Sequence, residues 1–129
     1  MSEGIRAPGE RVVIDRPETM NLLGLLMKGL LAANLADERK YSRAKKLEGD
    51  VAVKAGEMVI TLRFHDGLLT ILRGPMEKPR ARVRGTMAAL LAVVINKGLV
   101  GRVLSGQMMI GGNPFFLLKI LPLIREPAK

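Results

Sequence analysis

The sequence predicts a single α+β domain, in which helices cover one face of a five-stranded, mainly antiparallel sheet. Three observations support this. The middle of the chain alternates apolar and polar residues over short runs separated by turn residues, as in a meander of strands. Apolar runs with helical spacing stand on both sides of it, within 22–35 and 87–95. A chain of 129 residues is long enough for one hydrophobic core.

Residues 1–15 are expected to form a polar N-terminal extension, with a short strand at 12–14, and residues 16–129 to form the domain. The extension is either partly disordered or added at the sheet edge. Arg16-Pro17-Glu18 predicts the start of a helix, with proline and an acid in its first turn. A broad apolar stripe follows, made of Leu22, Leu23, Leu26, Met27, Leu30, Leu31 and Leu35. Such a stripe indicates packing against the core.

Strands are expected next at 51–54, 58–64, 68–72 and 80–84, and a fifth at 107–110. Asp66-Gly67 suits the tight turn of a hairpin between the second and third of these strands. The fourth strand alternates basic and apolar residues. Its period of two places Arg80, Arg82 and Arg84 on one face.

The last third of the chain predicts helix, helix, strand and helix. Thr86 caps a helix over 87–95, and a short helix covers 99–104. Gly111-Gly112 either merely ends the strand or forms a flexible joint that lets the last helix move. Asn113-Pro114 then opens a final helix, with an Asn cap and a proline at the first helical position. That helix, over 115–124, is apolar nearly all round. It must be buried or must cover something apolar.

The order of these pieces resembles the sterol carrier protein type 2 (SCP2-like) family of small lipid-binding domains. The segment LSGQMMIGGNP is similar to the family signature SGKLKIEGD, with Asn113 where the family usually carries an acid. The departure is mild, because Asn caps a helix as well as Asp does. The resemblance extends more loosely back to about Val51.

The resemblance implies a non-catalytic protein that binds or transfers a sterol, fatty acyl chain or other lipid in an apolar cavity between the sheet and the helices. By position, it implies a lining of Leu90, Leu91, Val94, Val103, Leu104, Met108, Ile110, Phe115, Leu118 and Leu121. Taken singly, a residue of this kind more often packs in an ordinary core than lines a cavity. Only the set as a whole predicts a cavity. Bacterial members of the superfamily bind quinone intermediates, which implies an alternative role as an accessory factor in isoprenoid-quinone biosynthesis.

Composition agrees with an apolar site and an anionic partner. Hydrophobic residues make up 48% of the chain, including 8 Met, yet aromatic residues make up only 3%. An aliphatic, Met-rich interior is deformable and can line a cavity, although it also suits an ordinary core. The net charge of +9 indicates phospholipid headgroups or nucleic acid. Residues expected to face an anionic membrane in transient contacts are Arg39, Lys40, Arg43, Lys45, Lys46, Arg80, Arg82 and Arg84.

Nucleic-acid binding is the alternative from a different class. Three alternating arginines and a pI of about 10.5 would suit phosphate contacts. The aromatic residues, however, are few and scattered, at Tyr41, Phe64, Phe115 and Phe116. They do not form the stacking surface on which unpaired bases bind. Lipid is therefore the preferred partner.

The residues predict no catalytic, metal or cofactor site. The chain has no cysteine and one histidine, which excludes thiol catalysis and cysteine-based metal sites. His65 lies beside Asp66 at the predicted hairpin, where polar residues usually serve the turn. Residues 1–12 lack the pattern of a secretory signal, and no apolar run reaches the ~20 residues of a membrane span. We therefore expect a cytoplasmic protein, peripheral at membranes.

Overall fold

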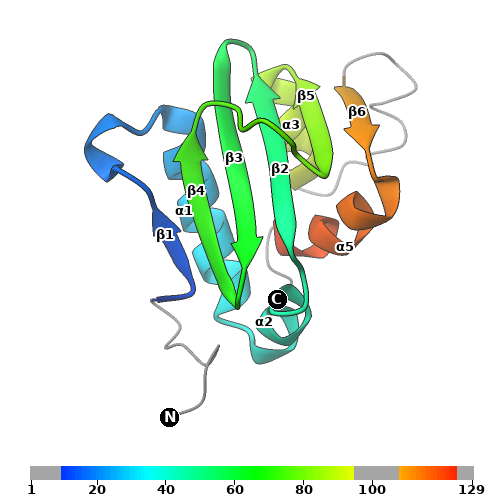
Figure 1. The fold of residues 1–129 in the computed structure, drawn as a ribbon. Helices are drawn as coiled ribbons and strands as arrows, with labels where there is room; N and C mark the ends of the chain where they lie inside the picture. Colours follow the sequence, from blue (N-terminus) through cyan, green and yellow to red (C-terminus); the bar gives the residue numbers. More distant parts are fainter. Residues whose placement is uncertain (1–9, 95–107, 125–129) are drawn as a thin grey trace.

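The structure is a computed structural model that describes residues 10–94 and 108–124. Its strands are β1 Val12–Ile14, β2 Gly49–Ala55, β3 Met58–His65, β4 Leu68–Arg73, β5 Ala81–Gly85 and β6 Met108–Gly112. Its helices are α1 Leu22–Leu35, α2 Glu38–Ala44, α3 Met87–Val94 and α5 Pro114–Ile124, with a 3-10 turn at Pro17–Thr19. α1 and α3 lie behind the sheet in Figure 1, and the front face carries none of the described helices.

The sheet has six strands in the order β1-β4-β3-β2-β5-β6. Three of its neighbouring pairs are antiparallel, β2–β3, β3–β4 and β5–β6, whereas β1–β4 and β2–β5 are parallel. The α+β class and the mainly antiparallel sheet are therefore confirmed. The expected number of five strands is wrong by one.

The additional strand is β1, which lies within the stretch expected to be an extension. Val12 pairs with Leu69 of β4 and is 1% exposed. Arg11 holds the start of the strand, because its Nη1 donates to the carbonyl of Leu35 at 2.6 Å and its guanidinium lies 3.9 Å from the centre of the Tyr41 ring. The short strand expected at 12–14 is therefore confirmed, and of the two outcomes expected for this stretch the addition at the sheet edge is the correct one.

The first helix begins later than the sequence indicates. Pro17–Thr19 forms only a 3-10 turn, because Arg16 before it has a left-handed backbone (φ 56°) and Met20 after it is extended. α1 starts at Leu22, where Asn21 caps it by accepting a hydrogen bond from the Gly24 amide at 3.0 Å.

α1 buries a narrower stripe than the sequence predicts. Its core-facing side chains follow one i, i+4 row, namely Leu23, Met27, Leu31 and Leu35. Leu30 packs partly against the same core. Leu22 and Leu26 were expected in the stripe but are 57% and 46% exposed, so that part of the prediction is wrong.

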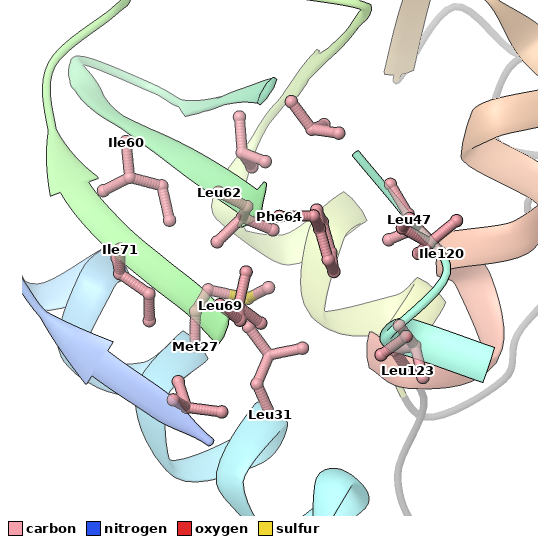
Figure 2. Close-up of a cluster of buried hydrophobic side chains, with 14 of the residues drawn as sticks. Met27, Leu31, Leu47, Ile60, Leu62, Phe64, Leu69, Ile71, Ile120 and Leu123 are labelled. Atoms are coloured by element: carbon pink, nitrogen blue, oxygen red, sulfur yellow. The ribbon is translucent and has the colours of Figure 1, made fainter. Parts of the chain in front are cut away.

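One apolar core lies between the sheet and the helices. Figure 2 shows the side chains of α1, β3 and β4 meeting those of α5 and the segment before β2. The labelled members are Met27, Leu31, Leu47, Ile60, Leu62, Phe64, Leu69, Ile71, Ile120 and Leu123. Each buried aliphatic or aromatic side chain of this kind contributes about 1.5–3 kcal/mol. These side chains fill the space under the middle of the sheet.

The turn from β6 into α5 is held tightly against the start of β5. The amide of Asn113 donates to the carbonyl of Arg80 at 2.8 Å, and the Asn113 side chain accepts from the amides of Phe115 and Phe116, as the predicted cap requires. Gly112 has φ 79°, and a Cβ there would lie 2.8 Å from the Cα of Ala81. Glycine at 112 therefore permits a close backbone approach.

Replacing Gly112 with Ala should destabilise the protein by about 1–3 kcal/mol, because it adds a left-handed backbone penalty to a clash with backbone atoms. Gly111→Ala is the matched control, since its Cβ would meet first the Arg82 side chain at 3.6 Å, an ordinary contact. Urea unfolding of both variants measures the difference. Equal losses of stability at the two positions would contradict the close-approach explanation.

Candidate functional site

The residues predicted to line a cavity do not share one environment. Met108 on β6 is 2% exposed, and Leu90 on α3 packs partly against the core. Ile110 is 41%, Phe115 71% and Leu118 59% exposed. The positions of Val103 and Leu104 and the side chains of Leu91, Val94 and Leu121 lie outside the described part of the chain.

α5 turns a different face to the core than the sequence indicates. Phe116 and Ile120 are each 3% exposed, and the Phe116 ring meets Phe64 edge-on, with 6.1 Å between the ring centres. Phe115 and Leu118, which we placed in the lining beneath the sheet, are on the exposed side of the helix. Their assignment to the sheet side is therefore wrong. Sequence reasoning missed Phe116, because a helix that is apolar nearly all round gives no rotational signal.

Apolar residues are uncovered where β6 meets α5. A groove of about 240 Å³ lies at this joint, lined by Ile110, Gly111, Gly112, Pro114 and Leu117. We call it the joint groove. Ile110 is the residue of the predicted lining that opens directly into it.

A second groove, of about 470 Å³, lies on the sheet face that carries none of the described helices; we call it the outer groove. Its lining comprises Ala52, Lys54, Val59, Pro75, Arg82, Val83, Arg84, Met109, Ile110 and Gly111. It shares Ile110 and Gly111 with the joint groove, so the two adjoin along β6.

A third groove, of about 370 Å³, lies between the end of α2 and the exposed side of α5; we call it the α2–α5 groove. Two leucines and three bases line it, namely Leu47, Leu118, Arg43, Lys46 and Lys119. The exposed face of α5 thus presents apolar and cationic side chains together.

The predicted membrane-facing bases are divided among several surfaces. Arg43 and Lys46 line the α2–α5 groove, Arg82 and Arg84 line the outer groove, and Arg39 is exposed on α2. Lys40 donates to Asn34 Oδ1 at 2.7 Å, and Lys45 lies 5.4 Å from the centre of the Tyr41 ring.

Arg80 departs from the predicted row of three arginines. β5 begins at Ala81, and the Arg80 guanidinium lies 4.4 Å from the centre of the Phe116 ring, while its Nη1 donates to the carbonyl of Glu48 at 2.8 Å. The prediction of one shared face therefore holds for Arg82 and Arg84 and is wrong for Arg80. Contacts with α5 direct this side chain, and the strand period does not.

His65 takes part in an exposed turn network. Its Nδ1 lies 2.8 Å from Glu48 Oε1, and the amide of Asp66 donates to Glu48 Oε2 at 2.8 Å. The backbone hydrogen bond first, and the contact with His65 second, lower the pKa of Glu48 below its usual range. Across residues 10–94 and 108–124, no group of three or more His, Cys, Asp or Glu side chains could hold a metal ion.

The described helices include none long and apolar enough to cross a membrane.

Comparison with protein-family models matches residues 27–125 to the SCP-2 sterol transfer family. A search of curated proteins found no match. Among solved structures, "UbiJ-SCP2 Ubiquinone synthesis protein" is similar with a TM-score of 0.66 and 17% identity, over 80% of this chain and 93% of that one. Apo sterol carrier protein 2 from Yarrowia lipolytica is similar with a TM-score of 0.60 and 13% identity, over 84% of this chain and 99% of that one.

A third similar structure is the stereoselective inverting sec-alkylsulfatase Pisa1 from Pseudomonas sp., with a TM-score of 0.69 and 17% identity. The match covers 84% of this chain but only 17% of the sulfatase chain, so it concerns a small part of that protein. At these identities the three structures establish the fold.

The Glu48 network predicts a pH-dependent contribution to stability. Because the folded-state pKa of Glu48 is lowered, its contribution is present above the unfolded-state pKa and is lost as pH falls through the folded-state value. Urea midpoints of the wild type and Glu48→Gln should therefore differ at neutral pH and converge once the pH has fallen below the usual range of a glutamate side chain. The difference should be small, because the pair is exposed. Glu57→Gln, in another turn, is the control, and a gap that persists in strong acid, where Glu48 is protonated, would contradict the assignment.

Proposed function

We propose a ligand site for this chain on the premise that it belongs to the SCP-2 sterol transfer family, whose model matches residues 27–125. Binding or transfer of a hydrophobic ligand is the function of that family. The proposal is that the ligand enters at the joint groove and lies at the end of the fold formed by α3, β6 and α5. Leu90 and Met108 would contact it from the core side, and Ile110 and Leu117 from the groove.

The supporting observation is the exposure of large apolar side chains on the last two described elements. Ile110 on β6 is 41% exposed, and Leu117 on α5 is only partly buried. Neighbouring apolar side chains left open to water mark ligand or partner sites more often than scattered ones do. Ile110 and Leu117 line one groove, so a ligand there would cover apolar surface on both elements.

The ligand is proposed to be a sterol, a fatty acyl chain or another lipid. An alternative is a quinone precursor, with the chain acting as an accessory factor in isoprenoid-quinone biosynthesis. The likeness to a structure named as a ubiquinone synthesis protein supports keeping this alternative. We propose a binding role without catalysis. Native mass spectrometry of protein purified from its own host, followed by lipid extraction, would identify the ligand.

Displacement of a fluorescent fatty acid by unlabelled lipid tests the proposed site. Ile110→Ser should weaken binding about 3- to 10-fold, because it removes an apolar contact at the groove. The residue is already 41% exposed, so the variant should fold. Leu22→Ser is the control, since Leu22 is 57% exposed at the start of α1. Equal affinity of both variants and the wild type would exclude the joint groove as the entry.

We also propose that the α2–α5 groove docks reversibly on anionic membranes. Arg43, Lys46 and Lys119 surround Leu118, and Phe115 precedes Leu118 by three residues on the same exposed side of the helix. Each base near an anionic surface contributes about 1 kcal/mol, within a Debye length. Two apolar anchors among three cations thus give weak docking, which a carrier needs in order to leave with its cargo.

Liposome co-sedimentation should show binding to anionic vesicles but not to zwitterionic vesicles, and binding should be lost at high salt. The triple change of Arg43, Lys46 and Lys119 to Ser should abolish it, because these bases share the groove with Leu118. The matched control changes Lys54, Arg82 and Arg84 to Ser, which removes the same charge from the opposite groove. Equal losses would show a diffuse charge effect. Tighter binding to duplex or single-stranded oligonucleotides than to vesicles would favour nucleic acid.

A further inference from the structure

We propose that the outer groove binds a second class of ligand, a single-chain amphiphile with a phosphate monoester head, taken from solution. The groove lies on the sheet face opposite α1 and α3 (Figure 1), away from the core beneath the sheet. Three cations and an apolar floor meet there, and this combination carries the inference.

The cations come from neighbouring strands in register. In the parallel pair β2–β5, Lys54 is the partner of Arg84 and Ala52 is the partner of Arg82. Side chains of partners in adjacent strands lie within ~6 Å of one another, so like charges there repel. The sheet therefore holds Lys54 and Arg84 side by side, with Arg82 two residues along the same face.

The described residues supply no carboxylate to this cluster. Lys54, Arg82 and Arg84 form no ion pair within the described ranges. The acid on the same face of β2 is Asp50, and both of its carboxylate oxygens accept from Arg63 at 3.0 Å. All three side chains are exposed, so their mutual repulsion is modest, but together they create a positive potential that attracts an anion.

The floor of the groove is apolar. Ala52 and Val59 provide its centre from β2 and β3, Pro75 closes one side, and Met109 stands on the other at 56% exposure. Met109 is the register partner of Arg84, so an apolar side chain borders the cations directly. A volume of about 470 Å³ falls within the range of sites for small organic ligands, which is roughly 300–1,000 Å³.

Two features favour a phosphate head and a small molecule. A phosphate monoester carries a charge of about −1.5 to −2 at neutral pH, which matches three cations better than a carboxylate does. Arginine also binds phosphate through two parallel hydrogen bonds, and Arg82 and Arg84 are both available. The cations border a groove, whereas docking on a membrane uses protruding side chains, so the geometry favours a small molecule. No aromatic side chain lines the groove among the described residues, which disfavours nucleic acid.

Calorimetric titration with octyl phosphate below its micelle concentration tests the proposal. Binding should be at least about tenfold tighter than that of octanoate or inorganic phosphate, because only octyl phosphate matches both the charge and the floor. Arg82→Gln combined with Arg84→Gln should weaken it at least about tenfold. Arg43→Gln in α2 combined with Lys46→Gln just after it should leave octyl phosphate affinity unchanged.

Three results would overturn the proposal. The first is equal octyl phosphate affinity in the Arg82/Arg84 double variant and the wild type. The second is equal affinity of the wild type for inorganic phosphate and octyl phosphate. The third is that these residues bind only anionic vesicles or only oligonucleotides, with no binding of octyl phosphate from solution. Met109→Ser, at an exposed position, should lower octyl phosphate affinity but not inorganic phosphate affinity. Arg84→Gln alone should also raise the urea midpoint at low salt, by relieving repulsion from Lys54. Loss of stability on that change would contradict the like-charge cluster.

The outer groove adjoins the proposed lipid site at Ile110 and Gly111, but its three cations lie outside that site. Octyl phosphate should not displace a bound fluorescent fatty acid, and the Arg82/Arg84 double variant should keep fatty-acid binding. Competition between octyl phosphate and the fatty acid would show that they share one site and would overturn the outer groove as a second ligand site. Octyl phosphate binding without any fatty-acid binding would instead reject the lipid site and leave the outer groove supported.

Discussion

The contacts of Arg80 determine how the C-terminal part of the structure is assembled. Its amide donates to the backbone carbonyl of Asp50 at 2.7 Å, and its own carbonyl accepts from the amide of Asn113 at 2.8 Å. Its side chain donates to the carbonyl of Glu48 and lies over the ring of Phe116. One residue thus links the start of β2, the start of β5 and the first turn of α5. The rotation of α5, and with it the exposure of Phe115, depends on this arrangement.

The far end of α5 is held by a second buried polar contact. Asn34 of α1 is fully buried, and its Nδ2 donates to the carbonyl of Leu123 at 2.7 Å, while its Oδ1 accepts from Lys40. Buried polar groups without partners are costly, so these bonds select one position of α5 against α1. With both ends held, α5 covers the core with one face and presents apolar and basic residues on the other.

The positive charge of the chain has several roles in the structure. Arg11 and Arg80 bind carbonyl groups and lie against aromatic rings, and Arg63 pairs with Asp50. Three further cations, Arg43, Lys46 and Lys119, line the α2–α5 groove, and three more, Lys54, Arg82 and Arg84, line the outer groove on the other face of the sheet. The exposed Leu118 and Phe115 make the α2–α5 groove suited to a membrane surface. The apolar floor of the outer groove makes it suited to a small molecule.

Local sequence determined the helix caps at Thr86 and Asn113, the strand periods, the turn at Asp66-Gly67 and the order of elements that resembles the family, because each depends on residues a few positions apart. Only the tertiary structure decided that Phe116 faces the core, that Arg80 leaves the row of Arg82 and Arg84, and that 12–14 joins the sheet. A helix that is apolar nearly all round has no preferred rotation, and a strand period does not say which element covers which face. Contacts between residues distant in sequence made these choices.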